Sequence, residues 1–465
     1  MKNFAEILNK SFPDGMNPVL VKELRQTLNG RTLAGSFIGL VLISILFCFL
    51  DLQISPVGRG TGFSALYVFI YWFMLILPAA GCFSRWYVER GQDCLTPEYT
   101  TTLSPFTILN GKLLSVLISS LILFLAGLPA FLFLCGRWDY SVPLFSGLFL
   151  LAFAFFLATV MFLCLLCLSQ GRRKVSTGSL PGITLLGLLF WFVGFQFLEF
   201  FCYPAREGAF DMAIQADVLL FSFAVQCYFW CYARLLPEQA NRMVLPRISG
   251  LILCLLLVAL SGVCRLDSGL VLCYYGTVNV LIASFERLEQ TKRSCAELPE
   301  NPFLRQIVFF FSSGACRGLF YGIVFLAAGI LLLFFTDAST GKWGDMSWNG
   351  RFAACLDWYN PYVAFCLYLV FYAELLLVLR RWNPRWKPLV LLLIICGFLS
   401  LPSMFCLFAG GGEGIFFLFS PLSIAFGEKS LAIPALLCAA ILVVIVIQNF
   451  SVAFFRKVFA PRKGE

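Results

Sequence analysis

The residue types that usually carry catalysis are sparse in this chain of 465 residues. It has no histidine, which excludes His-based acid/base catalysis, Ser-His-Asp triads and HExxH zinc sites. The few carboxylates do not cluster along the sequence. Cys164-x-x-Cys167 has the spacing of a redox or metal motif, but it lies in a continuous apolar run, where small polarizable side chains typically fill helix contacts. We therefore expect no enzyme, no metal site and no cofactor bound by this chain.

A phosphate-binding loop is also not predicted, although Gly111-Lys112 resembles part of one. Leu113 replaces the required Ser or Thr, and Phe106 stands where the first glycine belongs. The apolar runs around it are too long for the strand that precedes such a loop. Any use of ATP would therefore need a separate subunit.

The composition predicts an all-α polytopic membrane protein. The chain is 60% apolar and only 13% charged, about half the charge of a typical soluble domain. Its apolar residues form long blocks, as transmembrane helices require. We count about twelve spans, near 32–50, 63–83, 113–135, 143–168, 177–201, 212–233, 248–264, 269–285, 314–336, 362–379, 388–408 and 431–455.

The charge distribution sets the expected topology. With the N-terminus in the cytoplasm, only seven of the 34 Lys and Arg residues fall in outer loops. This bias follows the positive-inside rule and places both termini in the cytoplasm. The net charge of +9 therefore reflects topology, and no nucleic-acid partner is needed to explain it. The polar linker near 234–250 suggests an N-terminal segment 1–31 and two six-span units, 32–235 and 236–465.

A short amphipathic helix is predicted just before the first span. Asn17 is a good N-cap and Pro18 fits the first helical position of a helix through Asn29. Its apolar face is formed by Leu20, Val21, Leu24 and Leu28, and its polar face by Lys22, Glu23, Arg25, Gln26 and Asn29. Such a helix lies in the membrane interface with its cations toward the headgroups.

The loop after the second span contains a further helix start. Ser104 is a credible N-cap and Pro105 fits the first helical position, so the helix is expected to run through Lys112 into the third span. A structured element would then project into the cytoplasm between two long helices. That geometry suits mechanical coupling to a soluble domain.

These two regions resemble the membrane permeases of the ABC-2 class of ATP-binding-cassette transporters. The Asn-Pro-x-x-x-Lys-Glu-Leu-Arg elbow of that family is matched by Asn17, Pro18, Lys22, Glu23, Leu24 and Arg25. The Glu-Arg-x-Gly element after its second span is close to Glu89, Arg90 and Gly91. The Thr-Thr-Pro-Leu-Ser and Ile-x-x-Gly-Lys elements are matched by 100–104 and by Ile108 to Lys112, with Thr102 in place of the proline.

The resemblance implies a function and a set of partners. The elbow would lie at the cytoplasmic membrane surface, and residues 85–112 would form a coupling helix that docks on a separate ABC ATPase subunit. The chain would then be the permease subunit of an exporter in a bacterial inner membrane, with ATP used by its partner. Assembly as a homodimer or a heterodimer is compatible with this reading.

Two other classes of function stay open. Twelve spans also suit an ion-coupled secondary transporter, which usually places ionisable residues near the midplane. Glu199 and Asp217 lie toward outer span ends, and Glu374 lies about one and a half turns from Arg380, where it is placed to pair with cytoplasmic cations. A membrane-bound enzyme would need an acid/base cluster that the sequence lacks.

Two features of the second half concern packing and partners. Gly314, Gly318 and Gly322 recur every four residues and predict close helix packing, with a dimer seam as the alternative. The mixed-charge segment 286–313 is typical of a solvated face, and contact with a cytoplasmic partner is the alternative reading.

Overall fold

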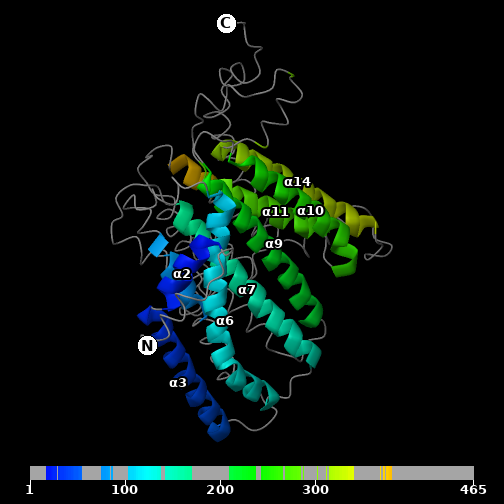
Figure 1. Cartoon of the computed structure of the whole chain (residues 1–465). Coiled ribbons are helices and arrows are strands. Elements are labelled where there is room, and N and C mark those ends of the chain that lie inside the picture. Colours follow the sequence, from blue (N-terminus) through cyan, green and yellow to red (C-terminus); the bar gives the residue numbers. More distant parts are fainter. Residues whose placement is uncertain are drawn as a thin grey trace. The chain divides into compact units, whose positions relative to one another are not determined.

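The structure is a computed structural model in which all of the described secondary structure is helical (Figure 1). It describes, besides a few isolated positions, residues 17–28, 30–54, 75–83, 85–86, 103–137, 142–169, 209–236, 242–264, 268–283, 314–339 and 373–379. The contacts divide the chain into two compact units, Met1–Leu236 and Pro237–Glu465. The other predicted spans and segments lie outside the described residues.

In the first unit, two short sequence signals set where helices begin. Helix α2 spans Pro18–Leu28, and the Val19 amide donates to Asn17 Oδ1 at 3.0 Å, as an N-cap does. Helix α6 spans Pro105–Arg137, and the Thr107 amide donates to Ser104 Oγ at 3.2 Å. Both helix starts agree with the predictions, and α6 continues through Lys112 into the apolar run without a break.

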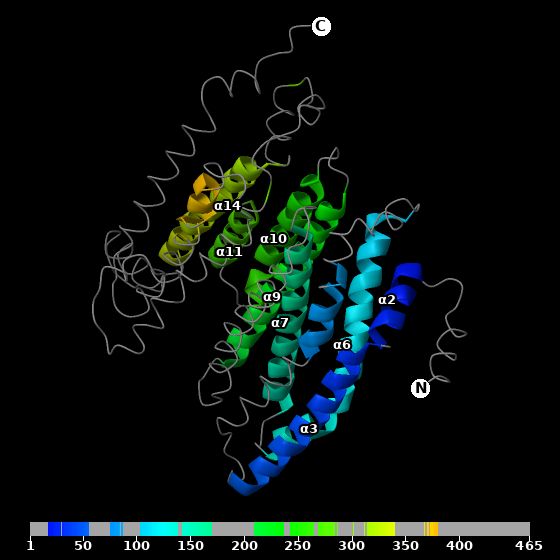
Figure 2. The ribbon, with the colours of Figure 1, turned by 90° about the vertical axis from the view of Figure 1, so that its left-hand side faces the viewer.

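Besides the short helical segment 75–83, the other described helices of this unit are long and apolar. They are α3 (Arg31–Ile54), α7 (Val142–Ser169) and α9 (Ala209–Leu235). Helices α2 and α3 both pack on α6, and α7 packs along α9 (Figure 2). The fold thus holds α2 against the N-terminal part of α6. The elbow motif, residues 17–25, lies on α2 and its N-cap, and the Ile-x-x-Gly-Lys motif, residues 108–112, lies on this part of α6.

Several described helices fit a membrane. Leu33–Gln53, Pro105–Phe133 and Asp217–Leu235 are long and apolar enough to cross one, and shorter apolar helices include Val244–Leu260 and Arg317–Leu333. Large apolar side chains stay exposed along α3, which suits contact with lipid and not with water. They are Phe37, Ile38, Leu42, Ile45, Leu46, Phe49 and Leu52. The full set of twelve spans stays a prediction.

The long helices described in the second unit are α10 (Val244–Cys264), α11 (Ser268–Ala283) and α14 (Ala315–Ser339), and residues 373–379 are helical as well. Helices α11 and α14 pack closely because glycines let their backbones approach (Figure 1). A Cβ added at Gly322 would lie 2.7 Å from the Gly276 carbonyl oxygen, and one at Gly276 would lie 2.6 Å from the Leu326 amide nitrogen. Gly318 likewise faces Ala283, whereas Gly314 precedes α14 at a φ of 142° and does not share this contact.

Candidate functional site

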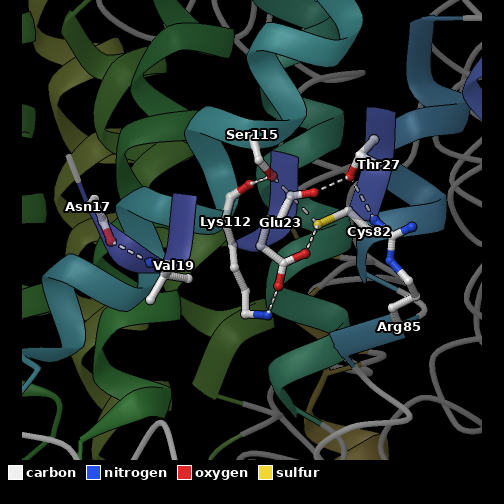
Figure 3. Close-up of polar contacts among 8 residues, drawn as sticks. All are labelled: Asn17, Val19, Glu23, Thr27, Cys82, Arg85, Lys112 and Ser115. Atoms are coloured by element: carbon white, nitrogen blue, oxygen red, sulfur yellow. Dashed lines mark hydrogen bonds and ion pairs between the residues drawn. The ribbon is translucent and has the colours of Figure 1, made fainter. Parts of the chain in front are cut away.

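The candidate site is a buried ion pair between α2 and α6. Lys112 Nζ donates a hydrogen bond to Glu23 Oε1, and the two side chains are 0% and 1% exposed (Figure 3). The residues are 89 positions apart in sequence. Each belongs to one of the two motifs that carry the family resemblance. We call this pair and its supporting contacts the α2–α6 clasp.

Asn17 contributes a second link of the clasp. Its Oδ1 caps α2, while its Nδ2 donates to the Thr107 carbonyl oxygen at 2.7 Å. One side chain therefore starts α2 and holds that start on the first turn of α6. The Val21 amide also donates to the Asn17 carbonyl at 3.1 Å, which continues the helix from this point.

Gly111 allows the two helices to meet. A Cβ at this position would lie 2.8 Å from Val19 Cβ, 2.9 Å from the Leu20 amide nitrogen and 3.0 Å from Asn17 Nδ2. Contacts this short are closer than side chains tolerate, and one of them is to backbone. The glycine of the Ile-x-x-Gly-Lys element therefore has a physical role here, which is to let α2 lie directly on α6.

We expect Gly111→Val to separate α2 from α6 at a cost of about 1–3 kcal/mol, as overpacking of a tight contact does. Cys82, which is 1% exposed beside the ion pair, should then react with N-ethylmaleimide faster than in the parent protein, as peptide-resolved mass spectrometry would show. Gly35→Val on α3 is the matched control, since nothing lies within 4 Å of a Cβ there. Equal Cys82 reactivity in both variants would contradict the close-contact role.

A third segment, 75–86, closes the clasp. Cys82 Sγ lies 3.7 Å from Glu23 Oε2 and 4.0 Å from Ser115 Oγ. The Trp86 ring lies below Lys112, with Nζ 5.0 Å from the ring centroid, close enough for a cation–π interaction. Both charges of the pair are thus enclosed by a thiol, a hydroxyl and an aromatic ring.

Thr27 and Arg85 tie the same segment to α2. Arg85 Nη2 donates to Thr27 Oγ1 at 2.8 Å, and Thr27 Oγ1 donates to the Glu23 carbonyl oxygen at 2.8 Å. Ser115 Oγ makes the equivalent bond on α6, to the Lys112 carbonyl at 2.8 Å. Both helix turns that carry the ion pair are therefore held by side-chain hydrogen bonds of their own.

The structure corrects one prediction about the elbow helix. Glu23 was expected on a polar face toward the headgroups, but it is buried against α6, because Lys112 offers it a fixed partner. Lys22 is exposed, Pro18 is exposed at the helix start and Arg25 is half-buried. Glu89, Arg90 and Gly91 lie outside the described residues, so their predicted role stays a prediction.

Several residues of the clasp were not predicted from sequence. They are Thr27, Cys82, Arg85, Trp86 and Ser115. Only Arg85 and Trp86 had a signal, because they stand in the same polar run as Glu89. The others lie within helical segments whose pattern carries no mark of a polar contact.

The second unit contains a comparable buried ion pair. Arg247 Nη2 lies 2.9 Å from Glu286 Oε1 and 3.0 Å from Oε2, with side chains 2% and 4% exposed. The Gly314 amide donates to Glu286 Oε2 at 2.7 Å. The pair therefore links the start of α10 to the residue before α14. The solvated reading of segment 286–313 is wrong for Glu286.

Two tyrosines lie beside this second ion pair. We call the pair of Arg247 and Glu286, with its contacts to the Gly314 amide, Tyr275 and Tyr321, the α10–α14 clasp. The hydroxyl of Tyr321 donates to the Arg247 carbonyl at 3.1 Å, and the hydroxyl of Tyr275 lies 2.9 Å from that of Tyr321. The guanidinium of Arg247 lies 5.8 Å from the Tyr321 ring centroid. As in the first unit, aromatic groups and helix ends enclose the charges.

Neither clasp has the chemistry of a catalytic site. Each acid is paired with a cation inside the protein, so neither is placed to act as a free base. Cys164 and Cys167 on α7 are buried in the packing against α9, where Cys227 and Cys231 also lie. Within the described ranges, no three His, Cys, Asp or Glu side chains form a group suited to a metal ion. Their geometry instead suits a structural role: the first clasp fixes α2 relative to α6, and the second fixes the start of α10 relative to the start of α14.

Comparison with known proteins adds no assignment: no family model, curated protein or solved structure matches this chain.

Proposed function

We propose that this protein is the membrane permease subunit of an ABC transporter of the ABC-2 class, acting as an exporter with a separate ATPase subunit. The observation that carries the proposal is the α2–α6 clasp. The two motifs of the resemblance lie far apart in sequence, yet Glu23 of one is paired with Lys112 of the other. The separation of the two motifs by 89 positions does not by itself bring them together, so their contact is independent of the sequence match.

The continuity of α6 supports a mechanical role. Because α6 runs from Pro105 to Arg137 as one helix, force applied to its first turn is passed directly into the apolar part. Ser104 is exposed at the start of that turn, where a partner could contact it, and Asn110, also exposed, accepts a hydrogen bond from the Tyr228 hydroxyl of α9 at 2.6 Å. The clasp would carry the same movement to α2 and α3. In this proposal the turn faces the cytoplasm, both termini lie inside, and α2 rests at the inner membrane surface.

The partner would supply the ATP chemistry. The Gly111-Lys112 pair cannot serve as a phosphate loop, because Gly111 lies against α2 and Lys112 is fully buried in the ion pair. ATP binding and hydrolysis are therefore assigned to a soluble subunit that docks near residues 85–112.

Site-specific photocrosslinking tests this proposal. A benzophenone amino acid at Ser104, in the full chain in its native membrane, should crosslink to a soluble protein with both a P-loop and an ABC signature sequence. The same group at Leu42, which is 62% exposed on α3, is the control and should crosslink to lipid only. Vanadate-sensitive ATP hydrolysis should copurify with the chain. A Ser104 crosslink only to proteins without a P-loop, or only to lipid, would refute the assignment.

A further inference from the structure

Glu374 is an acidic residue placed inside the apolar core of the second unit. Its side chain is 0% exposed. On a helix, the positions three and four residues away share its face. At Glu374 those positions are Val370, Phe371, Leu377 and Val378, and all four belong to or pack on the apolar cluster that this segment forms with α11 and α14.

Both carboxylate oxygens of Glu374 are buried, and neither has a hydrogen-bond partner. The expected pairing with a cytoplasmic cation is therefore not found among the described residues, and Arg380 lies outside them. The contrast with two other buried glutamates is direct. Glu23 has Lys112 and Cys82, and Glu286 has Arg247 and the Gly314 amide.

The titratable groups described on the helices packed against this segment do not form hydrogen bonds with Glu374 either. The titratable side chains that the structure describes are Cys273, Tyr274 and Tyr275 on α11, and Arg317 and Tyr321 on α14. The hydroxyls of Tyr275 and Tyr321 are bonded to each other and to the Arg247 carbonyl. No described cation therefore compensates the charge that Glu374 would carry when ionised.

The chemistry of the surroundings selects the ligand. An ionised carboxylate without a partner in an apolar core costs several kcal/mol, so the site favours a bound positive species. A metal ion would need several oxygen ligands, whereas the described neighbours are hydrocarbon side chains. A proton needs only one carboxylate oxygen.

We propose that Glu374 is a proton-binding site within the helical core of the second unit, formed by one bare carboxyl among Val370, Phe371 and Leu377. Carboxyl groups placed in this way in membrane helices take up and release protons as helices move. Protonation would favour the packed arrangement of this segment on α11 and α14, and ionisation would favour its separation. The inference does not depend on an ATPase partner.

Labelling with dicyclohexylcarbodiimide tests the site in the purified full-length protein. This apolar reagent reacts with protonated carboxyl groups in apolar surroundings and leaves ionised ones unmodified. We expect modification at Glu374, found by peptide mass spectrometry, and none at the ion-paired Glu23 and Glu286. Modification of Glu374 should fall at least about tenfold between pH 5 and pH 10, since each pH unit changes the ratio of protonated to ionised carboxyl by about tenfold. Sodium ions should give no protection.

A second measurement covers the case in which the reagent cannot reach the core. As the pH rises to alkaline values, the thermal unfolding temperature of the parent protein should fall further than that of Glu374→Gln. Only the parent has a group at position 374 that gains a charge in the apolar core. Each contrary outcome overturns the proposal: modification of all three glutamates alike, modification independent of pH, protection by sodium, or identical pH dependence of unfolding in parent and variant. None of these outcomes bears on ATPase binding, which the Ser104 crosslink tests separately.

Discussion

Glu23→Gln should destabilise the first unit by about 3–5 kcal/mol, because it removes the carboxylate that is paired with the buried ammonium of Lys112. For a unit of this size, that cost corresponds to a fall of about 6–20 °C in unfolding temperature. The reactivity of buried cysteines on heating measures it. Cys82, Cys164 and Cys227 report on the first unit, and Cys254 and Cys273 report on the second. We expect the cysteines of the first unit to become reactive at a lower temperature than in the parent protein, and those of the second unit to become reactive at the same temperature as before.

A double substitution separates the cost of the unpaired charge from the worth of the pair. Glu23→Leu with Lys112→Met removes both charges, and such replacements of buried pairs are often neutral or stabilising. This variant should therefore unfold near the parent temperature. Gln26→Ala, an exposed change on the same helix, should leave unfolding unchanged. If Glu23→Gln unfolded like Gln26→Ala, the ion pair would not be a structural link.

The double variant also tests the mechanical role. If the clasp transmits movement from α6 to α2, a stable protein without the pair should still crosslink to the ATPase through Ser104 but should support less ATP-driven transport. A purely structural clasp would leave both unchanged once stability is restored.

Local signals in the sequence were sufficient to predict where α2 and α6 begin. An Asn or Ser N-cap followed by proline acts through bonds to the next two or three residues, so the tertiary structure is not needed. The same reasoning could not predict the fate of Glu23. Its helical pattern assigns it to the polar face with Lys22, and only a partner 89 residues away reverses that assignment.

The second unit gives a parallel case. Glycines four residues apart predict close helix packing because the pattern and the geometry share one period, and Gly318 and Gly322 lie against α11. Gly314 has the same spacing but a different role: its amide donates to Glu286 at a positive φ. Glu286 stands in a mixed-charge run that resembles a solvated loop. Its burial depends on Arg247, which sequence alone cannot bring near it.

Arg247→Met should destabilise the second unit by about 3–5 kcal/mol, because it removes the guanidinium that is paired with the buried Glu286, while the Gly314 amide bond stays. Arg247→Lys should cost less, since the charge stays, yet it should not restore the parent, because one ammonium cannot reproduce the planar guanidinium beside both oxygens. Heating should raise the reactivity of Cys254 and Cys273 before that of Cys164. Ile252→Ala, 60% exposed on the same helix, is the control. If Cys164 became reactive at a lower temperature than Cys254 and Cys273, the α10–α14 clasp would not be what stabilises its own unit. The two clasps would then have to be treated as one cooperative system.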